Sequence, residues 1–540
     1  MSDTKNTSRP NIILYVTDRQ RADACGCYGQ TLETTPVLDE MAAQGIIFKE
    51  AYSTQACPNA MKAALLTGQD MTKTGCFKRH TQLNPEVKTL ADLAEEQGYE
   101  TAFTGHWQLG ANDKIAPDSP VTAEQRGGFK GFWRGSHEIT ATSKSINEGY
   151  VYDENGNKVE FKGNRSLCVS DFAVDFLKQH DAARPFFLTV FQAEAFQRTR
   201  EDVEAQIEDS REELEKSIEE YIEKNEITAI AKKQEVTEHM RLAAMEKIFK
   251  FESADEEFEK EHYFPRLPLD VQLYSSNIRT DYPRYLGQLR RVDEGLGRII
   301  EQLKSSGQYD NTFIVFTSTS GNTFGARSAN HNTTGFDDAG RTSHKGSTHV
   351  PLVIGGGAVR EHREVEALVS TESVAKTIGL LMTGGCTCCD SLNGENLLTV
   401  APEADSSRAL YYMIGESRTG RAIRTNDEMY AVFAPDVKGE ESCTSDVWRD
   451  EFYYDLVSDF CEANNLIKAE RYKDQKKAIR ERLLELMEKH EGKRFEIQDP
   501  LPDYVEEDDD EEKADDKERP QPKIRPKTRP SNSKAEVKAE

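Results

Sequence analysis

Asn11-Ile-Ile-Leu-Tyr-Val-Thr-Asp18 is a short run of apolar residues that ends in a polar pair. A run of this length and composition is typical of a strand that is covered on both faces of a sheet. Phe186-Phe-Leu-Thr-Val-Phe191 has the same character, and so do residues 311–317 and 350–355. The sequence therefore predicts buried strands of a largely parallel sheet at these four places.

Helical patterns separate the predicted strands. Residues 36–44, 90–97 and 285–303 carry apolar side chains at helical spacing, and short strands are expected at 46–48 and 101–103. Strands that alternate with helices indicate an α/β fold in which helices cover both faces of one sheet.

The chain is strongly acidic. Its 540 residues hold 69 Lys and Arg against 95 Asp and Glu, which gives a formal charge of −26. Nucleic acid and anionic membrane surfaces repel such a chain, so we expect neither as a partner. No run approaches the 18 or so apolar residues of a membrane span, and residues 1–10 lack the apolar core of a signal peptide. The sequence thus predicts a cytoplasmic protein.

Two segments depart from the alternating pattern. Residues 200–262 are highly charged and almost continuously helical in pattern, which predicts a charged helical hairpin inserted into the body. The alternative is a coiled-coil arm that binds a protein partner or a second copy of the chain. Residues 496–540 include seven consecutive acidic residues at 506–512 and predict a disordered acidic tail, with a docking peptide as the alternative.

The ten cysteines are expected to be free thiols in a reducing compartment. Cys386, Cys388 and Cys389 form a C-x-C-C cluster that could suggest a metal site. The cluster lacks the second pair of ligands that makes zinc spacings convincing, so we expect structural or incidental thiols.

Several segments together resemble the sulfatases, the formylglycine-dependent branch of the alkaline-phosphatase superfamily. The resembling segments are Arg9–Asp18 with Gly26–Gly29, Ala63–Gly68, Asp310–Ser318, His349–Ile354, Gly420–Thr425, Tyr454–Asp459 and Asn464–Leu466. The resemblance implies an alkaline-phosphatase-like α/β sandwich over residues 9–380, with a smaller α+β domain over 381–495. Residues 1–8 are expected to be disordered.

The resemblance also implies a divalent cation such as Ca²⁺, held by oxygen ligands. The family's first ligand pair, Asp-Asp or Asp-Gln, corresponds here to Asp18-Arg19, and its second pair, Asp-His, to Thr319-Ser320. Asp18 is then the retained candidate ligand. An arginine about 4 Å from a dication costs on the order of 8 kcal/mol at an effective dielectric constant of 20. We therefore expect no bound metal and no other cofactor.

The family's nucleophile position is substituted as well. Counting back from Thr67-Gly68 places Lys62 at the family's Arg position and Pro58 at its nucleophile position. Proline has no nucleophilic side chain, and lysine lacks the planar fork of arginine. Cys57 lies one residue earlier, and a register slipped by one residue would restore a cysteine there.

The other pocket positions follow the same trend. The family's Gly-Lys-Trp-His-Leu-Gly corresponds to residues 105–110, which puts His106 and Gln108 at its catalytic Lys and His. Phe196 stands at a family His and Lys345 at a family Glu. With no catalytic residue expected intact, the resemblance predicts a pseudoenzyme that lacks sulfuric-ester hydrolysis and acts by binding or scaffolding.

Three alternatives remain open. The chain could be a hydrolase of sulfate or phosphate esters with a non-standard site, for which the candidates are His106, His331, His344, His349, Asp337 and Asp338. It could bind a sulfated or phosphorylated ligand without cleaving it, in an anion pocket formed by Arg19, Lys62 and Lys345. It could also be a scaffold that works through residues 200–262 or the acidic tail.

Overall fold

The computed structural model describes residues 9–112, 114–195, 211–225, 253–262, 278–324 and 342–500, with a few further positions between 227 and 270. The chain divides into two units, Met1–Pro500 and Leu501–Glu540, and all described residues belong to the first. The predicted disorder of residues 1–8 and of the tail beyond residue 500 falls outside the described residues.

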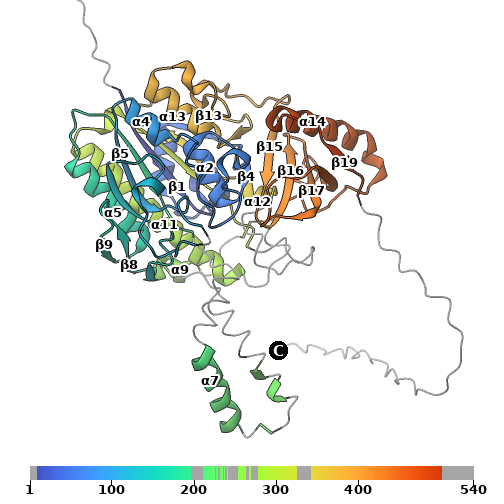
Figure 1. The fold of residues 1–540 in the computed structure, drawn as a ribbon, viewed down its shortest axis with the longest axis horizontal. Coiled ribbons are helices and arrows are strands. Elements are labelled where there is room, and N and C mark those ends of the chain that lie inside the picture. Colours follow the sequence, from blue (N-terminus) through green and yellow to red (C-terminus); the bar gives the residue numbers. More distant parts are fainter. Residues whose placement is uncertain are drawn as a thin grey trace, which may run out of the picture. The chain divides into compact units, whose positions relative to one another are not determined.

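An 11-stranded mixed sheet forms the centre of the first unit (Figure 1). Its path runs β13 (Arg363–Val365), β2 (Ile46–Phe48), β12 (Leu352–Gly355), β11 (Thr312–Ser318), β1 (Asn11–Thr17), β10 (Phe186–Phe191), β5 (Glu100–His106), β6 (Phe132–Ser136), β8 (Glu148–Tyr152) and β7 (Ser143–Ser145), with β9 (Lys158–Lys162) paired to β8. The five strands from β11 to β6 are parallel to one another. The predicted α/β fold with a mostly parallel central sheet is confirmed.

Helices cover both faces of this sheet. The helices of the described residues are α1 (Pro36–Gln44), α2 (Pro58–Thr67), α3 (Met71–Thr74), α4 (Leu90–Glu96), α5 (Arg165–Gln179), α7 (Arg211–Lys224), α9 (Glu256–Glu261), α11 (Ile278–Ser305), α12 (Lys345–Thr348), α13 (Ser373–Thr383) and α14 (Lys473–Glu491). Helices α2, α4 and α13 pack on one face and α1, α5 and α11 on the other (Figure 1).

The central strand β1 explains why its sequence is apolar throughout. All seven of its residues are buried, with Ile12, Leu14 and Val16 in the core beneath α2, α4 and α13. Ile13 and Tyr15 lie in the opposite core with α1, α5 and α11. A strand with helices on both faces has no solvent side, so its sequence does not alternate.

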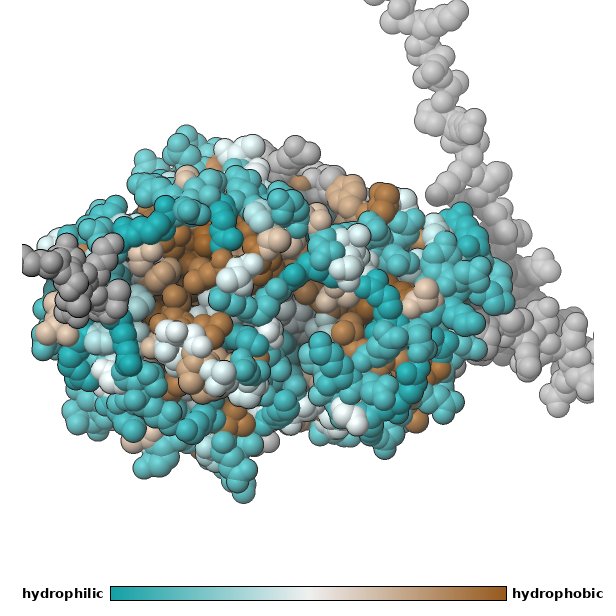
Figure 2. Space-filling view, turned by 90° about the horizontal axis from the view of Figure 1, so that it is seen from above, coloured by the Kyte–Doolittle hydropathy of each residue, from teal (hydrophilic) through white to brown (hydrophobic). Residues whose placement is uncertain are grey.

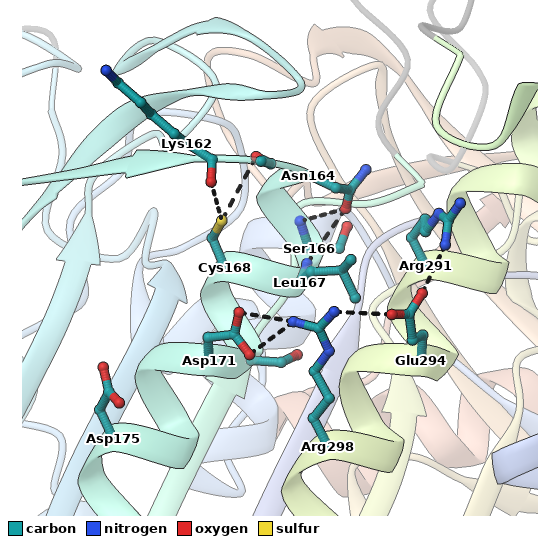
Figure 3. Close-up of polar contacts among 12 residues, drawn as sticks. Lys162, Asn164, Ser166, Leu167, Cys168, Asp171, Asp175, Arg291, Glu294 and Arg298 are labelled. Atoms are coloured by element: carbon teal, nitrogen blue, oxygen red, sulfur yellow. Dashed lines mark hydrogen bonds and ion pairs between the residues drawn. The ribbon is translucent and has the colours of Figure 1, made fainter.

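The helices α5 and α11 pack side by side and are joined by charged groups at the rim of their contact (Figure 3). Arg298 donates to Asp171 on α5 at 2.8 and 3.0 Å and to Glu294 on its own helix at 2.9 Å. Because Arg298 is partly exposed, these ion pairs add little to stability beside the apolar core below them.

A second, six-stranded sheet forms the smaller C-terminal part of the unit. Its order is β19 (Glu496–Gln498), β18 (Val447–Asp455), β17 (Glu428–Lys438), β16 (Arg418–Arg424), β15 (Leu410–Ile414) and β4 (Gln55–Ala56). Helix α14 covers one face through Ile479, Leu483 and Met487. A two-stranded ribbon, β3 (Ala51–Tyr52) with β14 (Val369–Ser370), completes the strands.

Three predicted boundaries differ from the structure. The acidic tail was placed from residue 496, but residues 496–498 form β19 because Ile497 is buried beside α14. The inserted hairpin was extended to residue 262, but α9 packs on α11 through buried Phe258 and belongs to the body. The domain boundary at 380/381 falls inside α13, which packs on α2 and α4.

The surface of the unit is mostly hydrophilic on the face shown in Figure 2, with apolar residues gathered mainly in one hollow. None of the described helices combines the length and the apolar character that a membrane span requires.

Candidate active-site pocket

A small pocket opens where the parallel strands end. Its volume is about 30 Å³, and it is lined by Asp18, Arg19, Cys57, Pro58, Asn59, Arg79, His106, Gln108, Thr140 and Glu416. Ligand sites of open α/β sheets lie beyond the carboxyl ends of the strands, which is where Asp18 and His106 stand. A space of this size has room for about two water molecules.

The ends of three neighbouring strands meet at Asp18. The Asp18 backbone N–H donates to the Glu194 carbonyl after β10 at 2.9 Å. The Thr319 hydroxyl, which follows β11, donates to Asp18 Oδ1 at 2.5 Å. The sheet register therefore brings the two predicted metal positions, Asp18 and Thr319, into direct contact.

The start of helix α2 forms the next wall of the pocket. Gln55–Ala56 pairs with β15 of the C-terminal sheet, and Cys57 then caps α2 with Pro58 as its first residue. Proline is well suited to this position because the first helical N–H has no partner within the helix. The Cys57 thiol donates to Glu416 Oε2 at 3.2 Å, so Cys57 and Pro58 both border the pocket.

Lys62 lies one turn further along α2 and is fully buried. Its Nζ donates to the His106 carbonyl at 2.9 Å and to Gln108 Oε1 at 2.7 Å. Burial lowers the pKa of Lys62 to about 8, against the attraction of Asp18 and Glu138. The ammonium is thus held behind the pocket wall.

The end of β5 carries His106 and Gln108 to the pocket. Gly105 has a φ of +105°, and a Cβ there would lie 2.0 Å from the Phe191 carbonyl oxygen, so only glycine fits. His106 Nδ1 accepts the Ile139 N–H at 3.1 Å, and burial lowers the pKa of His106 well below its usual value, which keeps the ring neutral.

Three pocket residues adopt the left-handed backbone conformation that non-glycine residues seldom take. Arg19 has a φ of +56°, Gln108 a φ of +62° and Glu416 a φ of +64°. Each such residue costs of order 1 kcal/mol or more, and such residues cluster at functional sites. Three of the six such residues in the described part of the chain line this one pocket, which supports it as the candidate site.

Sequence reasoning missed a buried ionic cluster beside the pocket. Arg79 donates to Glu138 at 2.6 and 3.0 Å, and His80 Nε2 contacts the same carboxylate at 2.8 Å. Burial would raise the pKa of Glu138, but Arg79 and the hydrogen bonds from His80 and Arg79 hold it well below its usual range. Asn59, Thr140 and Glu416 were missed as well, and no local motif identifies any of these residues.

Other predicted residues lie elsewhere. Lys345 is not among the pocket residues; its N–H donates to Glu462, and its charge lies near Asp23 and Glu50. Ser320 is buried after β11, and its hydroxyl has no hydrogen-bond partner among the described residues. The remaining candidates Phe196, His331, Asp337 and Asp338 fall outside the described residues.

The two other candidate histidines that the structure describes, His344 and His349, occupy separate environments. His344 contacts the Tyr454 hydroxyl at 3.2 Å and packs against Phe452. His349 lies between the rings of Tyr28 and Tyr52, and burial lowers its pKa to about 4. Neither lines the pocket that holds His106.

A larger pocket of about 900 Å³ borders α9 and α11. Both of its arginines are paired with carboxylates of the same lining: Asp255 with Arg290 and Arg291, and Glu294 with Arg291. The smaller pocket is the candidate site because it lies beyond the carboxyl ends of the parallel strands and is lined by residues of the family motifs.

The sheet order and the pocket at the strand ends define a protein of the alkaline-phosphatase-like class. The sequence model of the family Sulfatase matches residues 10–384. The chain therefore belongs to the sulfatase family.

Two curated relatives align over almost the whole chain. The N-acetylglucosamine-6-O-sulfatase of Bacteroides thetaiotaomicron is 25% identical, over 92% of this chain and 88% of the relative. The uncharacterized sulfatase YidJ of Escherichia coli strain K12 is 25% identical, over 92% of this chain and 89% of the relative. The crystal structure of YidJ from Bacteroides fragilis shares the fold, with a TM-score of 0.66 at 19% identity over 91% of this chain and 98% of that one.

The pocket residues do not fit the divalent cation that the family implies. The two carboxylates that line the pocket, Asp18 and Glu416, already accept hydrogen bonds from Thr319 and Cys57. Arg19 and Arg79 line the same small space and would repel a dication. Across the residues that the structure describes, no three His, Cys, Asp or Glu side chains are grouped to hold a metal.

Proposed function

We propose that this sulfatase-family chain does not hydrolyse sulfuric esters and acts instead by binding or scaffolding. The observation that carries the proposal is the convergence of Asp18, Pro58, His106 and Gln108 on one pocket. These are the residues that the family motifs align with a metal ligand, the nucleophile and two catalytic groups.

The chemistry of these side chains argues against ester hydrolysis. Pro58 offers no nucleophile, His106 is a neutral acceptor, and the nearby ammonium of Lys62 is tied to two oxygens. Removing a single nucleophile or base from an enzyme can cost about 10⁶ in rate, and here several groups are replaced together.

Turnover of sulfate esters by the purified chain tests the proposal. With an aryl sulfate, an aryl phosphate and 6-O-sulfated N-acetylglucosamine, we expect release of sulfate or phosphate no faster than with heat-denatured protein. The sugar is included because one relative is named as an N-acetylglucosamine-6-O-sulfatase. Turnover that copurifies with the folded chain and disappears in Asp18→Asn would overturn the proposal.

A hydrolase with a non-standard site is the second candidate, and the position of Cys57 favours it. Its thiol borders the pocket 3.2 Å from Glu416, a carboxylate that could act as general base. Any measured turnover should then fall to background in Cys57→Ala and in Glu416→Gln. Cys443→Ala, at a buried cysteine near the same helix but outside the pocket lining, is the matched control.

Scaffolding through the inserted segment makes a separate prediction. Because α9 packs on the body, replacing residues 203–250 by a short Gly/Ser linker should leave the thermal unfolding midpoint nearly unchanged. If the segment mediates self-association, the deletion lowers the mass in solution to that of a monomer. An oligomer that survives the deletion would exclude this role for the segment.

A further inference from the structure

The C-x-C-C cluster lies in a turn that directly follows helix α13. Gly384 and Gly385, both with positive φ, end the helix, and Thr387–Cys389 forms a short 3-10 turn capped by Cys386. Cys386 and Cys388 are exposed and Cys389 is buried. Two thiols that solvent can reach are therefore held on one tight turn.

The hydrogen bonds of the turn make the sulfurs of Cys386 and Cys388 unequal. The Cys386 sulfur accepts the backbone N–H of Cys388 at 3.3 Å, and the Cys386 N–H donates to the Thr383 hydroxyl at 3.2 Å. The Cys386 sulfur accepts hydrogen bonds from the N–H and from the thiol of Cys388, and both lower the pKa of Cys386. The same contact between the two side chains raises the pKa of Cys388 to about 12. Cys386 is thus the more easily ionised of the two thiols, which makes its sulfur the better nucleophile, and Cys388 is the one that stays protonated.

Cys389 is placed differently. Its sulfur is buried against α13, where a Cβ added to Gly379 would lie 3.0 Å from it. It lies 3.9 Å from the Cys388 sulfur, but a disulfide between adjacent residues closes a ring through their own peptide bond and distorts its planarity. Residues two apart across a helical turn have Cα atoms roughly 5 to 6 Å apart, within the range that a disulfide accepts.

We propose that Cys386 and Cys388 form a dithiol site that undergoes exchange with low-molecular-weight disulfides. The Cys386 thiolate attacks one sulfur of the small disulfide, which forms a mixed disulfide and releases one small thiolate. The Cys388 thiol loses its proton to that thiolate and attacks the Cys386 sulfur, which releases the second. The second released thiolate takes from water the proton that Cys386 gave up when it ionised. Counted from the dithiol, the protein loses two electrons and two protons, and one small disulfide becomes two small thiols.

Mass spectrometry of the full chain tests this proposal directly, because trypsin releases the three cysteines in one peptide, residues 377–408. After equilibration with reduced and oxidised glutathione, free thiols are alkylated and the protein is digested. In the reduced protein, we expect three alkyl groups on this peptide. On oxidation we expect one alkyl group and the loss of two hydrogens.

The same digest contains its own control. Residues 166–178 form a tryptic peptide with the half-buried single cysteine Cys168, which has no neighbouring thiol to resolve a mixed disulfide. The dithiol should oxidise at glutathione ratios at which Cys168 is still fully alkylated. Oxidation of both peptides at the same ratio would mean that the turn has no special reactivity and would overturn the proposal.

Three variants identify which sulfur attacks the small disulfide and which one completes the internal disulfide. Cys388→Ser should stop at a glutathione adduct on residue 386, and Cys389→Ser should still form the internal disulfide. Cys386→Ser should keep its two remaining thiols alkylated at the same ratio. Three alkyl groups on the wild-type peptide at every ratio, or an equally oxidised Cys386→Ser variant, would refute the assignment.

Discussion

Replacing Arg165 with Met is expected to destabilise the folded chain by about 3 to 5 kcal/mol. Arg165 is the first residue of α5, and its Nε and Nη2 donate to Glu194 Oε1 at 2.8 and 2.6 Å. Both side chains are almost fully buried, so the variant leaves a carboxylate without its charge partner and without water. Denaturant unfolding followed by far-UV circular dichroism measures the loss.

The double variant Arg165→Met/Glu194→Met separates the ion pair from the packing around it. Removing both charges also removes the desolvation cost of each, so the double variant should be more stable than Arg165→Met alone. Arg134→Met, which breaks a more exposed pair with Glu154, should cost less than about 1 kcal/mol. A double variant as unstable as the single one would show that the guanidinium acts through packing.

The central strands could be predicted because one physical constraint, burial on both faces of the sheet, makes their sequences apolar throughout. Phe186–Phe191 and Asn11–Thr17 are apolar since helices cover both of their faces, and helix α1 spans the residues that its pattern predicts. Helix α11 begins at Ile278, seven residues before its predicted start, and contains Pro283, a residue type that usually marks a helix start. Strand β19 was missed because three residues pairing with β18 leave no periodic pattern.

The pocket could be predicted only where linear motifs reach it. Asp18, Pro58, His106 and Gln108 belong to such motifs, and all four line the pocket. Glu138 and its partner Arg79 are 59 residues apart in the sequence, and Glu416 and its partner Cys57 are 359 residues apart. Neither contact belongs to a sequence motif.

Lys345 shows a different limit of motif reasoning. A motif assigns a residue to a sequence position, but the direction of its side chain depends on the charges around it. The charge of Lys345 lies near Asp23 and Glu50, so a position predicted for the pocket contributes nothing to its lining.

Replacing Lys62 with Met is expected to change how stability depends on pH. The pKa of Lys62 is about 8 in the folded chain and about 10.5 when the chain is unfolded. Between these values the unfolded chain binds more protons, so this group makes the folded state more stable as pH rises from 8 toward 10.5. The burial penalty on its charged form is fully present below pH 8. In the wild type, Lys62 should raise the free energy of unfolding by about 2 kcal/mol between pH 8 and 10, and Lys62→Met should lack this rise.

The comparison must be made between variants, because other groups act in the opposite direction over the same range. Burial raises the pKa of Cys76 to about 12, so the unfolded thiol ionises first and stability falls as pH rises. Subtracting the unfolding free energy of Lys62→Met from that of the wild type at each pH cancels these contributions. Lys130→Met, at an exposed lysine, should give a flat difference. A flat difference for Lys62→Met as well would mean that the ammonium is hydrated in the folded chain, and with it that the pocket wall is open to water.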